Sequence, residues 1–350
     1  NNITISVTGN YTTAELTALQ AKTIGTVTTN AGTTLTGTYT EVLAAASAAN
    51  FDGATNVTIT DPVTAAQIHE LQDAGKVDSG IVTATISDTA AGDILATNAD
   101  IQRAGAFTIT VAMTTIPVAG RTAAEQATDA AVTIANLNSI DALTTEVLNV
   151  TSGELRGAAP AAVTIFNKNT PDDSSVTKSI SGLENIAVNI NDGTASVAEI
   201  NKIASKTSGI VTASTDTGAI TDFVDATTGA SKITKSGNAL AINLSGSYKA
   251  SELITLDGVT TGVVTATAAP TITGSIAEIK TVYATSDSLS TVAAGPNTFS
   301  GLGGATLETT DTGTIQASDI KILNGFTTAE VGIPVTVERI SGTFADIEDV

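Results

Sequence analysis

Three stretches of the chain repeat one phrase: Thr12-Thr-Ala-Glu15-Leu16-Thr-Ala-Leu19, Thr38-Tyr-Thr-Glu41-Val42, and Thr64-Ala-Ala-Gln67-Ile68-His-Glu-Leu71. Each copy has a hydroxyl residue, an acidic or amide anchor three positions later, and aliphatic residues spaced for one helical face. The first anchors recur about every 26 residues, and a fixed period of this kind is the signature of a repeat architecture. The chain therefore predicts stacked units that pack on their neighbours.

The anchor column continues along the whole chain and predicts a series of short helices. Its members are Glu15, Glu41, Gln67, Asp93, Glu125, Glu146, Glu199, Asp222, Glu252, Glu278, Asp319 and Asp346. Seven of them follow a Ser or Thr by three positions: Thr12, Thr38, Thr64, Thr122, Ser196, Ser275 and Thr343. This is the capping-box spacing, in which the two side chains satisfy free backbone N–H groups at a helix start. Stretches between the anchors, such as 3–7 and 107–111, alternate apolar with polar residues and predict strands.

These elements predict an α/β repeat, a parallel β-solenoid with coils of about 26 residues, each reading strand, turn, short helix, strand. Alternate coils resemble each other, so the coils pair into larger units of about 52 residues. One continuous array is expected over residues 1–350, with a degenerate coil at about 160–185, where Pro171–Ser175 forms a loop in place of a helix, and a loop insertion at about 285–304. Residues 344–350 begin a new anchor helix, so we expect further chain or another subunit to cover that end.

Composition narrows the classes of partner. The 350 residues include 35 Asp and Glu against 15 Lys and Arg, which gives a net charge of −20. Such a surface repels nucleic acid and anionic lipid, and favours divalent cations or cationic partners. The absence of cysteine excludes disulfides and thiolate metal sites. No apolar run approaches the ~20 residues of a membrane span.

A metal site has weak candidates. The acidic column would suit a ladder of calcium ions, because carboxylates are the ligands that this cation prefers, but helix capping explains the same column. Asp172, Asp173 and Asp192 lie in clusters that would hold a cation in a loop, and ordinary turn chemistry explains them equally well. The sequence therefore requires no cofactor, and calcium is the one ion it suggests.

Catalytic residues are not evident. His69 is the single histidine, expected on the exposed side of its helix, and neither Ser-His nor Cys-His pairs are available. The tyrosines Tyr11, Tyr39, Tyr248 and Tyr283 recur beside anchors, which predicts packing positions; stacking on sugars is the alternative. These features predict a non-enzymatic protein.

Three phrases carry a resemblance: Ile272-Thr-Gly-Ser-Ile-Ala-Glu-Ile-Lys-Thr-Val-Tyr283, Ser300-Gly-Leu-Gly-Gly304 and Ser318-Asp-Ile-Lys-Ile-Leu-Asn-Gly325. They resemble the Thr/Ala-rich tandem repeats of giant secreted cell-surface proteins of cyanobacterial type. The resemblance implies an exported structural role, so we expect an extracellular surface layer or filament that self-associates through open solenoid ends. A glycan- or cation-binding adhesin, a phage fibre and a carbohydrate-active solenoid enzyme are the alternatives.

Overall fold

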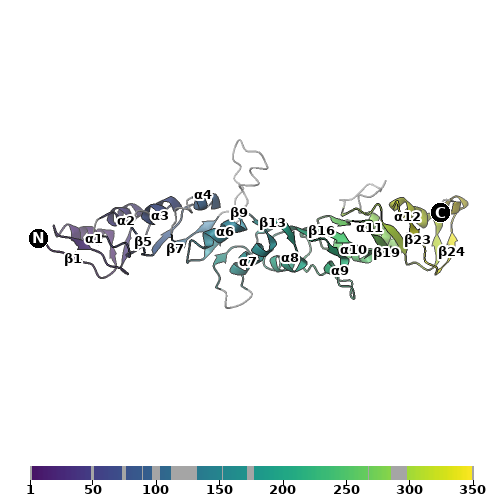
Figure 1. The fold of residues 1–350 in the computed structure, drawn as a ribbon, viewed down its shortest axis with the longest axis horizontal. Coiled ribbons are helices and arrows are strands. Elements are labelled where there is room, and N and C mark those ends of the chain that lie inside the picture. The colour runs from purple at the N-terminus through teal and green to yellow at the C-terminus, as the bar shows by residue number, and fades with distance from the viewer. Residues whose placement is uncertain are drawn as a thin grey trace, which may run out of the picture. The chain divides into compact units, whose positions relative to one another are not determined.

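The computed structural model describes residues 2–48, 51–72, 76–88, 90–96, 103–111, 132–151, 153–171, 177–266, 268–284 and 298–348. The chain is α/β, with several sheets of parallel strands (Figure 1). It divides into two compact units, described separately here: Asn1–Gly157 with Thr164–Ile186 (unit 1), and Ala158–Val163 with Ala187–Val350 (unit 2).

Unit 1 alternates short strands with helices of two or three turns. Its strands are β1 (Ile5–Ser6), β2 (Tyr11–Thr12), β3 (Val27–Thr28), β4 (Thr34–Gly37), β5 (Asn56–Ile59), β6 (Val82–Thr85), β7 (Ala106–Thr108), β8 (Thr110–Val111), β9 (Val132–Thr133), β10 (Leu148–Val150), β11 (Glu154–Gly157) and β12 (Ile180–Ser181). Its helices are α1 (Thr13–Gln20), α2 (Tyr39–Ala46), α3 (Ala65–Gln72), α4 (Ala91–Ala96) and α6 (Ile134–Asp141), and α7 (Ala159–Asn169) divides between the units.

The largest sheet of unit 1 is five-stranded, in the order β2-β4-β5-β6-β7, and every pair in it is parallel. In Figure 1, helices α1 to α4 follow one another along one side of these strands. Side-chain hydrogen bonds between neighbouring repeats join residues 22 to 28 apart, close to the period of the anchors. The other parallel pairs of this unit join β1 to β3, β9 to β11, and the central β10 to both β8 and β12.

Unit 2 repeats this arrangement. Its strands are β13 (Ala187–Ala195), β14 (Val211–Thr215), β15 (Gly218–Ala219), β16 (Ala239–Ser245), β17 (Tyr248–Lys249), β18 (Val264–Ala266), β19 (Thr271–Gly274), β20 (Phe299–Ser300), β21 (Thr306–Thr309), β22 (Gly313–Gln316), β23 (Val331–Gly332) and β24 (Val337–Ser341). Its helices are α8 (Val197–Ala204), α9 (Ile220–Phe223), α10 (Ala250–Asp257), α11 (Ile276–Ala284), α12 (Ala317–Phe326) and α13 (Phe344–Glu348). Parallel pairing orders its strands β13-β14-β16-β18-β20, β17-β19-β21-β23 and β22-β24, with β15 beside β16.

The alternating pattern places one side of each strand in the core. In β5, Val57 and Ile59 are buried, whereas Asn56 and Thr58, which alternate with them, are partly exposed. The aliphatic residues that follow the anchors on the helices, such as Ile68 and Leu71, are also fully buried. Layers of mainly aliphatic side chains therefore form the core.

Two helices lie where the sequence predicted none. The predicted anchor Glu146 lies in a turn, and its amide hydrogen-bonds to the Thr144 hydroxyl at 3.0 Å. The helix of that repeat is α6, which precedes β10 in the chain. Thr133 caps α6 by accepting a hydrogen bond from the Asn136 amide at 3.1 Å. Asn136 was missed because the column admitted only acidic residues and glutamine at this position.

The degenerate coil predicted at about 160–185 contains the helix α7, which the sequence did not predict. Pro160 lies in the first turn of α7, where a missing backbone N–H costs little. Behind it, Ala162, Ile165 and Phe166 have helical spacing and are fully buried. The residues 172–176 of the predicted loop lie outside the described residues.

The predicted insertion at about 285–304 has a structured end. Residues 285–297 lie outside the described part, but β20 follows directly, pairs with β18, and buries Phe299 and then Leu302. Residues 299–304 therefore belong to the layered core and not to a projecting loop. The predictions of one continuous array and of paired coils remain predictions.

Candidate functional site

The anchor residues that follow a Ser or Thr by three positions cap their helices, as predicted, in every pair that the structure describes. The backbone N–H of the cap residue donates to the anchor side chain in Thr12/Glu15 (2.8 Å), Thr38/Glu41 (3.0 Å), Thr64/Gln67 (2.8 Å), Ser196/Glu199 (2.9 Å) and Ser275/Glu278 (2.9 Å). In Thr343/Asp346 the Asp346 amide donates to the threonine hydroxyl at 3.2 Å. The pair Thr122/Glu125 lies outside the described residues.

Hydrogen bonding favours the charged form of two of these anchors, Glu15 and Glu41. Backbone and then side-chain hydrogen bonds from Thr12 lower the pKa of Glu15, and those from Thr38 lower the pKa of Glu41 in the same way. Because both pKa values are lower in the folded chain, the stabilisation is present above the unfolded pKa and is lost as the pH falls through the folded one. The negative charge of these residues therefore stabilises the first turns of their helices.

A second set of caps joins neighbouring repeats and has no local signature. The first amide of α2, at Tyr39, donates to Asp61 at 2.8 Å, and that of α3, at Ala65, donates to Asp88 at 2.7 Å. The first amide of α11, at Ile276, donates to Asp311 at 2.7 Å. Each aspartate follows the next strand of its sheet, so these carboxylates fasten one helix to the following repeat. The sequence signal is an Asp two or three residues beyond a strand, 22 to 35 residues after the helix start.

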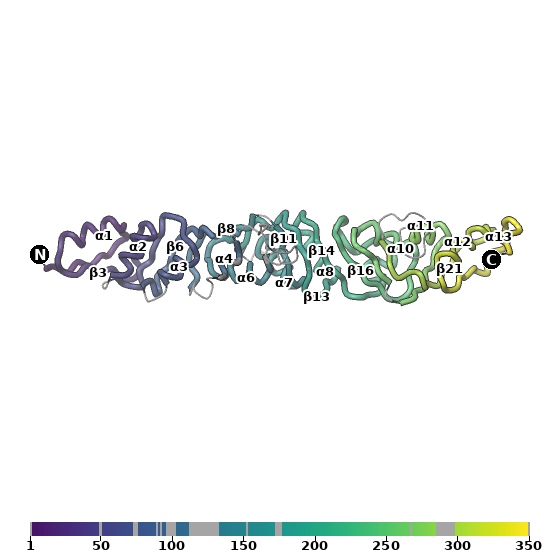
Figure 2. Tube along the Cα trace, turned by 90° about the horizontal axis from the view of Figure 1, so that it is seen from above, coloured from purple at the N-terminus to yellow at the C-terminus, as the bar shows by residue number. Residues whose placement is uncertain are grey.

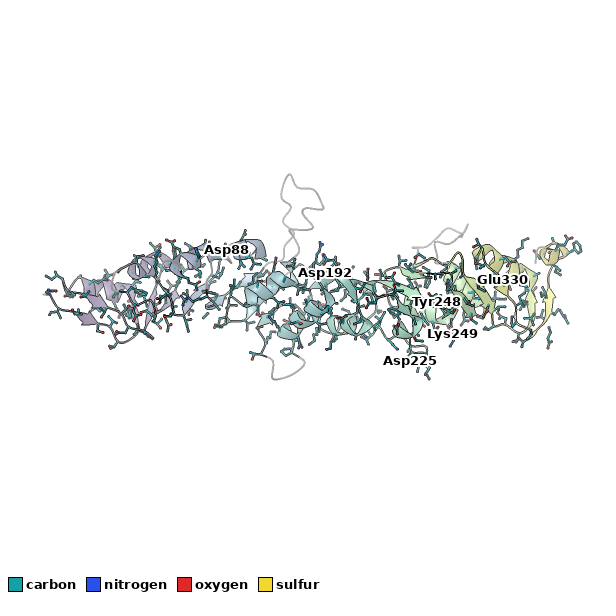
Figure 3. All side chains as sticks on the ribbon, viewed as in Figure 1. Asp88, Asp192, Asp225, Tyr248, Lys249 and Glu330 are labelled. Carbon is teal, nitrogen blue, oxygen red and sulfur yellow. The ribbon has the colours of Figure 1, made fainter. Side chains whose placement is uncertain are left out.

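The metal candidates do not form a site in the described structure. Asp192 (labelled in Figure 3) is exposed within β13, in the stretch between Ile190 and Ala195 where the register with β14 shifts. Asp172 and Asp173 lie outside the described residues. Among the residues described, no three His, Asp or Glu side chains gather closely enough to hold a metal ion. Asp225 serves a turn: the amides of Thr227 and Thr228 and the hydroxyl of Thr228 donate to it, and these bonds lower its pKa.

All four tyrosines are buried, with exposed fractions of 8% or less, so the packing interpretation is confirmed and a sugar-stacking platform is not formed by them. Burial raises the pKa of Tyr283, whose hydroxyl donates to the Leu302 carbonyl at 2.9 Å. The ring of Tyr283 stacks on Phe326 with a centroid distance of 4.7 Å. His69, expected on the exposed side of its helix, is instead half-buried in the last turn of α3.

An apolar surface lies on the last described repeat, at the yellow end of Figure 2. It consists of Ile340 of β24 and of Phe344 and Ile347 of α13, exposed by 38%, 79% and 49%. We refer to these three residues as the terminal apolar face. Phe344 and Ile347 are three positions apart, so they lie on one side of the helix.

A regular face of threonines lies on the five-stranded sheet of unit 1. In register across the strands, Thr36 pairs with Thr58 and Thr58 with Thr83, and beside this column Thr85 pairs with Thr108. Thr60 follows β5 at the level of Thr85. These six side chains are partly or fully exposed, and their hydroxyls make no hydrogen bond within the described residues. We refer to Thr36, Thr58, Thr60, Thr83, Thr85 and Thr108 as the threonine face.

The described helices include none with the length and apolar character that a membrane crossing requires. Comparison of the chain with protein-family models, with curated proteins and with solved structures finds no match.

Proposed function

We propose that the parallel sheets are successive coils of a β-solenoid, and that the chain is a non-enzymatic structural protein of an extracellular surface layer or filament. Copies join end to end, the terminal apolar face of one against the first repeat of the next. Support comes from the recurrence of caps and strand pairs at nearly the period of the anchors, and from the resemblance to tandem repeats of secreted surface proteins.

The observation that carries this proposal is the contrast between equivalent positions in the last two repeats. Ile340 pairs in register with Ile315, which is only 4% exposed. Phe344 and Ile347 occupy the first and fourth positions of α13, and their counterparts in α12, Ala317 and Ile320, are exposed by 0% and 2%. Positions that are buried in the repeat of α12 are thus exposed to solvent in the repeat of α13.

A second copy fits this face because the interior repeats already show what covers such positions, namely another repeat of the same kind. The first repeat also exposes aliphatic side chains, Ile3 by 57% and Ile24 by 84%. A contact between two different faces of one chain is heterologous, and when its rotation does not close it produces a filament.

Aspartate at both Phe344 and Ile347 is expected to abolish end-to-end assembly of the 350-residue chain. The charges would have to be buried unpaired in the contact, at a cost of several kcal/mol. Sedimentation velocity and negative-stain electron microscopy would show concentration-dependent, end-joined particles for the wild type and monomers for the double variant.

Ile210→Asp is the matched control, since Ile210 is 56% exposed on unit 2 but lies away from the terminal apolar face in the chain. It should assemble like the wild type. A wild-type chain that stays monomeric at all concentrations, or a double variant that still assembles, would contradict the proposal.

The threonine face favours a second candidate function, adhesion to ice. Neighbouring strands are about 4.8 Å apart and alternate residues along a strand about 6.6 Å apart, so the hydroxyls form a two-dimensional array. These distances are close to the repeats of water molecules on ice surfaces. Each threonine offers a hydroxyl that donates and accepts and a methyl group that orders water, and the face carries no charge although the chain is strongly acidic.

Tyrosine at both Thr83 and Thr85 is expected to remove ice binding by breaking the spacing of the array. Thermal hysteresis and inhibition of ice recrystallisation are the measurements. Thr281→Tyr, on the exposed side of α11, is the control and should behave as the wild type. Absence of both activities in the folded wild-type chain would eliminate this candidate and leave the structural role untouched.

A further inference from the structure

We propose that Lys168 and Asn138 join in an intrachain amide cross-link, formed by the chain itself, with Asp141 as the group that relays the proton. The cross-link would connect α6 to α7 within unit 1. It goes beyond the structural role proposed above and does not depend on it.

The three side chains meet between the two helices. The Lys168 amine donates to Asn138 Oδ1 at 3.0 Å and lies 2.7 Å from Asp141 Oδ2. Asn138 and Asp141 are three positions apart on α6, which places the carboxamide and the carboxyl group side by side on one face of the helix. The Lys168 amine is therefore within hydrogen-bond distance of both the Asn138 carboxamide that it would attack and the Asp141 carboxylate that would take its proton. A nucleophile and its base need this proximity.

The surroundings restrict water at the carboxyl group. The side chain of Asp141 is 11% exposed and that of Lys168 is 29% exposed. Leu137 and Ile140 on α6 and Ile165 on α7 are fully buried beside these positions in the sequence.

Asp141 also has an unfilled hydrogen-bonding position. Its Oδ2 accepts from Lys168 and from the Ser179 hydroxyl at 3.3 Å, whereas its buried Oδ1 has no hydrogen-bond partner in the described structure. A salt bridge alone leaves this oxygen unexplained, because buried carboxylate oxygens are normally satisfied. An N–H group of the carboxamide, or of the amide that replaces it, would supply the missing donor.

The reaction is an acyl transfer that balances without an oxidant or a cofactor. Asp141 takes a proton from the Lys168 ammonium group, and the neutral Nζ attacks Cγ of Asn138 to form a tetrahedral intermediate. Asp141 returns its proton to the carboxamide nitrogen, and the Cγ–N bond breaks. The products are one Nζ–Cγ amide bond and one molecule of ammonia, which leaves as ammonium after taking up the second proton of the amine.

Such a bond would serve the chain where its repeats are least regular. The neighbouring strand pairs β8/β10 and β10/β12 enclose longer segments than the pairs of the five-stranded sheet. A covalent link between residues 30 apart restricts the unfolded chain as a disulfide does. The chain has no cysteine for that purpose.

Intact-mass measurement of the full chain tests the proposal. The wild type is expected to be lighter than its sequence mass by one ammonia molecule, and tryptic digestion should give a branched peptide that joins residues 138 and 168, with no cleavage after Lys168. Asp141→Ala and Lys168→Arg should each restore the full sequence mass.

The ion pair between Lys280 and Asp319 provides the control, because it also joins two helices but no carboxamide hydrogen-bonds to its amine among the described contacts. Lys280→Arg should keep the loss of one ammonia. The wild-type mass decides the question even if a variant misfolds: a folded chain of full sequence mass, cleaved normally after Lys168 following prolonged incubation, would overturn the proposal.

Discussion

Gly182→Ala is expected to destabilise unit 1 by about 3 kcal/mol or more, because two separate costs combine at this position. The backbone of Gly182 has φ +90, a region that residues with a Cβ rarely adopt. A Cβ would also lie 1.8 Å from the carbonyl oxygen of Val150 in the neighbouring strand β10. That oxygen belongs to the backbone, so the two strands would have to separate to admit the methyl group.

Gly246→Ala separates the two costs. Gly246 has nearly the same φ, +93, but nothing lies within 4 Å of its added Cβ. Its substitution should therefore cost about 1 kcal/mol, the price of the left-handed conformation alone. Urea unfolding with hydrogen exchange resolved along the chain would give both values; equal losses at the two positions would show that the close approach of the backbone does not matter.

Close contacts of this kind explain three further glycines of the repeats. At Gly25, Gly80 and Gly262 an added Cβ would lie 1.9 to 2.4 Å from a carbonyl oxygen about 20 residues or more earlier in the chain. None of these three has a positive φ that would require glycine. Glycine is required at these three positions by the short distance to a neighbouring repeat, which no local pattern in the sequence records.

The elements that the sequence predicted well are those whose signals are local. In the pair Ser196 and Glu199, the cap and its anchor are three residues apart, so the hydrogen bonds that start α8 follow directly from the spacing. The strand periodicity is local in the same sense. Both signals depend on residue type and short distances along the chain.

The elements that were missed depend on contacts between repeats or on an unusual residue. The helix α7 has neither a hydroxyl cap nor an acidic anchor, and Pro160 with a buried face replaces both signals. Asp61 and Asp88 cap helices of the preceding repeat, so their role follows from stacking alone. The meeting of Lys168 with Asn138 across two helices was likewise not predictable without the position of α7.

Phe107→Ala is expected to cost about 3–5 kcal/mol, the range for removing a fully buried aromatic side chain. Phe107 lies in register with Ala84 of β6, and this small neighbour cannot fill the space that the ring would leave. The backbone of residue 107 would keep its bonds to the Thr144 hydroxyl, 3.2 Å from its amide and 2.6 Å from its carbonyl oxygen. The loss should therefore report the cavity, and hydrogen exchange of β6 and β7 would localise it.

Phe344→Ala is the same substitution on the terminal apolar face and should change the stability of the isolated chain by no more than about 0.5 kcal/mol, since Phe344 is 79% exposed. Under conditions of assembly the order reverses. Phe344→Ala would weaken the contact between copies, whereas Phe107→Ala would leave the contact surface unchanged in any molecule that remains folded. Unfolding at low concentration and sedimentation at high concentration thus distinguish a side chain that stabilises the fold from one that stabilises the proposed contact between copies. A large loss of stability for Phe344→Ala would show that this face is already covered within one chain.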